Sequence, residues 1–73
     1  MDAYENLANA VILRAVEDYR VAMRRLAINP KYPEALRMKA DCEEFFLSTW
    51  FSELTKLDGA DLLKKLKEEA HER

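Results

Sequence analysis

One stretch of the sequence decides the fold: Asn29-Pro30-Lys31-Tyr32-Pro33. It holds both prolines of the 73-residue chain, and the single glycine lies in a second short stretch, Asp58-Gly59. Proline and glycine are the strongest interrupters of helices, and long uninterrupted runs separate these two stretches. The sequence therefore predicts an all-α, three-helix domain covering residues 1–73: a long helical hairpin plus a shorter C-terminal helix.

The first helix is predicted from Ala3 to Ile28. At about 1.5 Å per residue it is roughly 39 Å long, which exceeds the width of a compact globule of this size. Its ends need cover from the other helices or from a partner, which favours self-association. Asn29 ends the helix, since a residue before proline disfavours helical geometry and asparagine tolerates the left-handed conformation. Apolar residues recur every three or four positions and form one stripe, with Ile12, Val16, Tyr19, Met23 and Leu26 in coiled-coil spacing.

The second helical segment begins at Pro33, whose missing N–H costs nothing in a first helical turn. Ser48 and Thr49 hydrogen-bond readily to their own backbone, so a kink or a short break is expected near Ser48. This segment contains the densest apolar region, residues 45–51. Adjacent side chains on a helix point about 100° apart, so these aromatic residues cannot all face one seam. In one interpretation these residues are buried between the first and third helices. In the other, Trp50 or Phe51 is exposed and anchors a partner. The two interpretations are compatible if the partner is another copy of the chain.

The last helix is predicted to start at Asp58, a good N-cap residue, with Asp61 in its first turn. Its buried stripe comprises Leu62, Leu63, Leu66 and Ala70. Four-residue spacing predicts two ion pairs on the exposed side, Lys64–Glu68 and Lys65–Glu69.

The net charge is −2, which gives no overall attraction to nucleic acid or to an anionic membrane. The charges are nevertheless segregated along the chain. Residues 14–39 carry seven basic and three acidic side chains, whereas residues 40–58 carry five acidic and one basic. These regions of opposite sign can pair within one molecule or between two copies.

No constellation of residues predicts catalysis, a cofactor or a metal site. Cys42 is alone, so an intrachain disulfide or a cysteine-based metal site cannot form. His71 is the only histidine, and no second group is placed to hold it. The longest charge-free stretches have eight residues, against about 20 for a membrane span, and the acidic N-terminus does not resemble a signal peptide. A non-enzymatic protein of the cytoplasm is therefore expected.

The predicted function is that of a small protein–protein interaction or accessory protein, with a homodimer as one form. Its candidate interaction surface comprises Tyr19, Arg20, Arg24, Arg25, Trp50 and Phe51. The alternative is a nucleic-acid-associated regulator that contacts phosphates through Arg14, Arg20, Arg24, Arg25 and Lys31. Glu17 and Asp18 lie one turn from Arg14 and Arg20, which favours ordinary pairs within the helix and makes nucleic-acid binding less expected.

Two resemblances accompany this pattern. Residues 15–22 followed by residues 29–35 look like the second helix and exit corner of a tetratricopeptide repeat, but neither repeat that 73 residues could hold is complete, which indicates a shared packing solution. Features over most of the chain are Tyr4-x-x-Leu7-Ala8-Asn9-Ala10, Asp18-Tyr19-Arg20, Asn29-Pro30, Phe45-Phe46-x-Ser48-x-Trp50-Phe51 and Leu57-Asp58-Gly59. In these features the chain resembles small, uncharacterised helical proteins of Firmicutes phages and conjugative elements. That resemblance implies a cytoplasmic setting connected with a mobile element, and no particular activity.

Overall fold

The computed structural model describes the backbone of residues 3–71 and the side chains of residues 7–70. Four helices follow one another along this part of the chain, without any strand: α1 (Ala3–Ile28), α2 (Pro33–Phe46), α3 (Thr49–Leu54) and α4 (Gly59–His71). The all-α prediction is confirmed. Two helices, α2 and α3, occupy the region of the predicted second segment, for which the sequence predicts a kink or a short break near Ser48.

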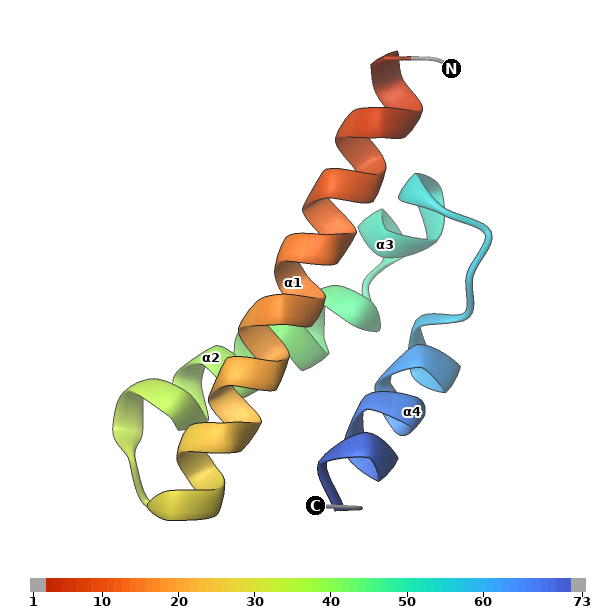
Figure 1. Cartoon of the computed structure of the whole chain (residues 1–73). Helices are drawn as coiled ribbons and strands as arrows, with labels where there is room; N and C mark the ends of the chain where they lie inside the picture. Colours follow the sequence, from red (N-terminus) through yellow and green to blue (C-terminus); the bar gives the residue numbers. More distant parts are fainter. Residues whose placement is uncertain (1–2, 72–73) are drawn as a thin grey trace.

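Helices α1 and α2 form the predicted antiparallel hairpin, and α4 packs against both of them (Figure 1). At the corner, the Asn29 N–H donates to the carbonyl oxygen of Arg25 at 2.8 Å. The Asn29 side chain then accepts from the backbone N–H of Lys31 at 3.2 Å. Asn29 does not adopt the left-handed conformation that asparagine tolerates, and none of the described residues has a positive φ. The Asn side chain instead closes the corner through its own hydrogen bond.

The junction between α2 and α3 lies at Leu47 and Ser48. The Ser48 hydroxyl donates to the carbonyl oxygen of Phe45 at 2.6 Å and accepts from the backbone N–H of Phe51 at 3.1 Å. One hydroxyl therefore satisfies a carbonyl at the end of α2 and a free N–H at the start of α3, which is the role of an N-cap.

The core lies between all four helices and is dominated by aromatic rings. Tyr19, Phe46 and Phe51 are its largest fully buried side chains. The rings of Tyr19 and Phe46 meet edge to face with centroids 6.3 Å apart, and those of Phe46 and Phe51 do so at 5.7 Å. Such edge-to-face contacts add to the stabilisation from burial alone. The small residues Ala8, Ala22 and Ala35 are also buried and allow the helices to approach closely.

The start of α4 is held close to the end of α2. Asp58 caps α4 as predicted, since its carboxylate accepts from the N–H groups of Ala60 at 3.0 Å and Asp61 at 3.3 Å. Gly59 is buried directly against the last carbonyl group of α2, that of Phe46. A side chain at this position would collide with that carbonyl, so the packing of α4 on α2 requires glycine.

The molecule is elongated, with dimensions of 40 × 22 × 21 Å, and α1 runs along its whole length. The N-terminal turns of α1 extend beyond α2 and α4, and α3 is the helix beside them (Figure 1). Leu7 and Leu13 remain exposed in this half of α1. The predicted excess length of the first helix is therefore present, and the other helices cover it only in part.

Candidate interaction site

A polar cluster beneath the surface ties three helices together. The Tyr19 hydroxyl in α1 donates to Glu43 Oε2 in α2 at 2.9 Å. Lys39 Nζ donates to the same oxygen at 2.8 Å, and Lys67 Nζ in α4 lies 3.7 Å from it. Burial alone would raise the pKa of Glu43, but the hydrogen bonds from Lys39 and Tyr19 and the nearby ammonium groups hold it below the usual value. Burial, and then the bond to Glu43, raise the pKa of Tyr19 well above its ordinary value.

This placement corrects one prediction. Tyr19 is 0% exposed, so it is a core residue that contributes to a contact surface only from beneath, as part of the lining of a groove. Its ring belongs to the aromatic core, and its hydroxyl has a partner in Glu43, so the residue satisfies both its apolar and its polar requirements inside the molecule.

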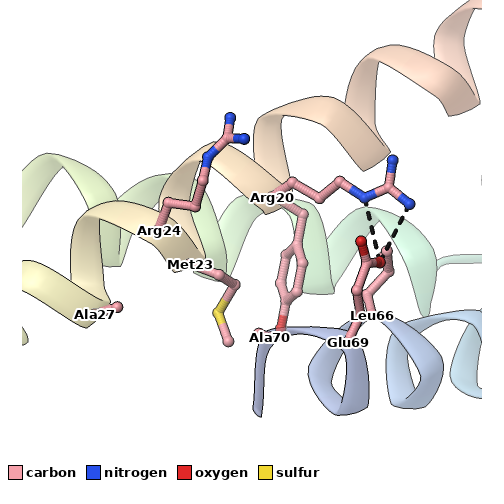
Figure 2. A pocket seen from close by; sticks show the side chains of 8 residues that line it. Arg20, Met23, Arg24, Ala27, Leu66, Glu69 and Ala70 are labelled. Carbon is pink, nitrogen blue, oxygen red and sulfur yellow. Dashed lines mark hydrogen bonds and ion pairs between the residues drawn. The ribbon is translucent and has the colours of Figure 1, made fainter. Parts of the chain in front are cut away.

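A groove opens between the C-terminal halves of α1 and α4 (Figure 2). Its volume is about 110 Å³. Helix α1 contributes Tyr19, Arg20, Met23, Arg24 and Ala27, and α4 contributes Leu66, Glu69 and Ala70. The floor is therefore apolar and the charged groups stand at the rim. We call this feature the α1–α4 groove.

Arg20 and Glu69 bridge the rim of the groove. Arg20 Nε and Nη2 lie 3.3 and 3.2 Å from the same carboxylate oxygen, Oε2 of Glu69 (Figure 2). The predicted pair of Lys65 with Glu69 is wrong, because Lys65 pairs with Asp61 at 3.1 Å and Glu69 faces α1. An exposed pair of this kind contributes only about 0–1 kcal/mol, so it orients the two helices more than it stabilises them.

The other predicted arginines are exposed but face different directions. Arg24 borders the groove through its stem, and its guanidinium extends on the side away from α4 (Figure 2). The guanidinium carbon of Arg25 lies 6.0 Å from the centre of the Tyr32 ring at the α1–α2 corner, within range of a cation–π contact. Arg14 pairs with Asp18 at 3.3 Å. Of the three predicted surface arginines, the groove brings together Arg20 and Arg24.

The aromatic region of α2 and α3 is divided between core and surface. Phe51 is 1% exposed, so its prediction as a surface residue is corrected: its ring packs edge to face on Phe45 and Phe46. Trp50 is 56% exposed, and its ring meets that of Phe45 edge to face with centroids 5.5 Å apart. Leu47, immediately before Ser48, is also exposed. Trp50 therefore lies at the surface, which is what the second of the two interpretations, an exposed anchor for a partner, requires.

Sequence analysis did not identify Glu43, Glu69 and Ala27 as contributors to the site. Glu43 and Glu69 each belong to a pair of adjacent glutamates, and nothing in the sequence says which member faces another helix. Met23 belongs to the predicted apolar stripe of α1 and also lines the groove. The sequence feature that indicates its place in the groove is its position next to Arg24.

Within the described side chains, no three His, Cys, Asp or Glu residues are grouped so that they could hold a metal ion. The side chain of His71 lies outside the described residues. Burial raises the pKa of the Cys42 thiol, as do the carboxylates of Asp18, Asp41 and Glu43, and the thiol donates to the carbonyl oxygen of Ala15 at 3.6 Å. This is the environment of an unreactive cysteine.

Two further findings bear on function. None of the helices, as far as their residues are described, has the length and apolar character needed to cross a membrane. Comparison of the chain with protein-family models, with curated proteins and with solved structures finds no match.

Proposed function

We propose that this chain is a small, non-enzymatic interaction or accessory protein of the cytoplasm, which presents a helical surface to another protein or to a second copy of itself. The observation that carries the proposal is the α1–α4 groove: an apolar floor at the surface of the molecule, with Arg20 and Arg24 at its rim. Arginine and methionine are both enriched where proteins bind one another, and both are present here.

The size of the groove favours a side chain of a partner over a small molecule. Pockets for cofactors and substrates usually measure about 300–1,000 Å³. The groove measures about 110 Å³, well below that range. One aliphatic side chain, or part of an aromatic one, fills such a space.

Binding to nucleic acid in a mobile element is the alternative function. It is favoured by the exposure of Arg24, Arg25 and Lys31 around the C-terminal end of α1. It has less support than protein binding, because Arg14 and Arg20 are each paired with a carboxylate, which reduces the positive charge available to phosphates. Each phosphate contact made by the remaining cations would appear as a decrease of affinity with salt.

Site-specific photo-crosslinking in the cells that produce the protein tests the proposal. A photoreactive amino acid replaces Ala27, an exposed residue at the edge of the groove, and in a matched control replaces Ala40, an exposed residue on the outer side of α2. We expect a protein adduct from position 27 and none from position 40. Adducts with DNA or RNA would instead establish the alternative. Equal labelling, or no labelling, at the two positions would refute a role for the groove.

A further inference from the structure

A second surface feature of the chain has the chemistry that the α1–α4 groove would accept. Four exposed residues succeed one another at three-residue steps across the α2–α3 junction: Glu44, Leu47, Trp50 and Glu53. Leu47 is 62% exposed and Trp50 is 56% exposed. Two large apolar side chains are thus flanked along the chain by two carboxylates. We call these four residues the acidic knob.

The charges of the knob and the groove are complementary. The α1 wall of the groove carries Arg20 and Arg24 and the α4 wall carries Glu69, so its rim has one more positive than negative charge, whereas the apolar groups of the knob stand between two carboxylates along the chain. The guanidinium of Arg24 extends outward from the groove, where a carboxylate of an occupant can meet it (Figure 2). Arg20 is already paired with Glu69, so the positive charge available to an occupant comes chiefly from Arg24, although the N–H groups of Arg20 that do not face Glu69 can still donate. This complementarity agrees with the distribution of charge along the chain, in which residues 14–39 are mainly basic and residues 40–58 mainly acidic.

The two features cannot meet within one molecule. Trp50 and Glu53 belong to α3, which lies beside the N-terminal half of α1, and Leu47 lines a separate hollow with Ala60 and Leu63 of α4. The α1–α4 groove lies between the C-terminal turns of α1 and α4, toward the other end of a molecule 40 Å long (Figure 1). A contact between knob and groove therefore joins two copies.

We propose that the α1–α4 groove binds the acidic knob of a second copy, with Leu47 or Trp50 on the apolar floor and with Glu44 and Glu53 facing Arg20 and Arg24. This inference rests on the proposed function and names the partner as the chain itself. A twofold axis would place each knob in the groove of the other copy and close a dimer, whereas a head-to-tail arrangement would form a ring or an open chain of copies. Tryptophan and arginine are the residues that most often dominate such contacts.

Sedimentation velocity of purified full-length protein, at roughly 5–200 µM, tests the inference, since association in the micromolar range is expected for one such contact. Wild-type protein should sediment with a mass that rises above 8.5 kDa as the concentration increases. Trp50→Ala removes the centre of the knob, and Arg24→Glu reverses the charge at the groove. Each should weaken association by about tenfold or more, as removal of a dominant contact residue does.

Two control variants keep the same chemistry away from the contact. Leu57→Ala removes another exposed leucine, and Arg37→Glu reverses another exposed arginine. Both should associate as the wild type does. Circular dichroism of every variant establishes that it is folded, and Glu53→Arg provides a second knob variant that does not remove the contact of Trp50 with Phe45.

Mixing the two impaired variants gives the decisive result. Arg24→Glu retains an intact knob and Trp50→Ala retains an intact groove, so an equimolar mixture should form a heterodimer although neither variant associates alone. A wild type that stays monomeric throughout would overturn the inference. So would association that both variants retain, or a mixture that fails to recover, since the contact would then be elsewhere or between two knobs. An adduct of position 27 with a different protein would still support the proposed function in each of these cases.

Discussion

Replacing Gly59 by alanine should destabilise the protein, although alanine is the better helix former. An added Cβ would meet the carbonyl oxygen of Phe46 at less than contact distance, the carbonyl carbon of Phe46 at 2.8 Å and Cδ1 of Phe51 at 3.1 Å. The first two atoms belong to the backbone of α2, which cannot turn aside as a side chain can. The helical preference of alanine gains at most about 1 kcal/mol, whereas forcing extra atoms into a packed core costs about 1–3 kcal/mol.

Because the clash is with backbone atoms, we expect a cost at the upper end of that range, about 2–3 kcal/mol. The net loss for Gly59→Ala is then about 1–2 kcal/mol, which lowers Tm by roughly 4–16 °C in a domain of this size. Urea titration and thermal melts followed by circular dichroism measure it. The matched control is Ala60→Gly, at the neighbouring exposed position in the first turn of α4. Its cost of about 0.5–1 kcal/mol comes from helix propensity alone. A Gly59→Ala protein as stable as the wild type, or more stable, would show that α4 does not approach α2 as described.

Three further predictions concern the polar groups around Tyr19. Tyr19→Phe removes the hydrogen bond to Glu43, which keeps its lysine partners, so the free energy of unfolding should fall by about 1–2 kcal/mol in urea titrations. The pKa of Glu43 is lowered in the folded protein, so its stabilisation is complete above the unfolded value of about 4.3 and is lost as the pH falls through the folded value. Thermal melts from pH 6 to pH 3 should show this loss, and Glu43→Gln should reduce it. Cys42 is buried with a raised pKa, so a thiol reagent should label it far more slowly in native protein than in urea; equal rates would contradict its burial.

The parts of the fold that the sequence predicts well are those decided by a few neighbouring residues. Pro33 begins α2 and Asp58 caps α4 where expected, because each acts on the backbone within one helical turn. The end of α1 at Ile28 follows in the same way from Asn29 and Pro30. Even here the mechanism differs in detail, since Asn29 closes the corner through its side chain.

The parts that the sequence does not predict depend on how helices lie against one another. Phe51 and Trp50 are adjacent and similar in character, yet one is buried and the other exposed, because the Ser48 cap starts a new helix with its own orientation. Glu69 was expected to pair along its own helix and pairs across to α1 instead. Each of these outcomes depends on where a second helix lies, and the spacing of apolar residues along one helix does not give that position. The groove was missed for the same reason, although two of its residues, Arg20 and Arg24, were among the predicted surface residues.

The groove is built by the same contacts that hold the fold together. Tyr19 contributes to its lining, and the hydroxyl of Tyr19 is fixed by Glu43, which in turn lies 3.7 Å from Lys67 of α4. At the other end of α4, Gly59 holds the helix against α2. Helix α4 is thus positioned from both ends before anything binds, so the separation of the groove walls is set by the core. A site prepared in this way would lose little backbone conformational entropy on being filled, which favours the contact proposed for a groove of only about 110 Å³.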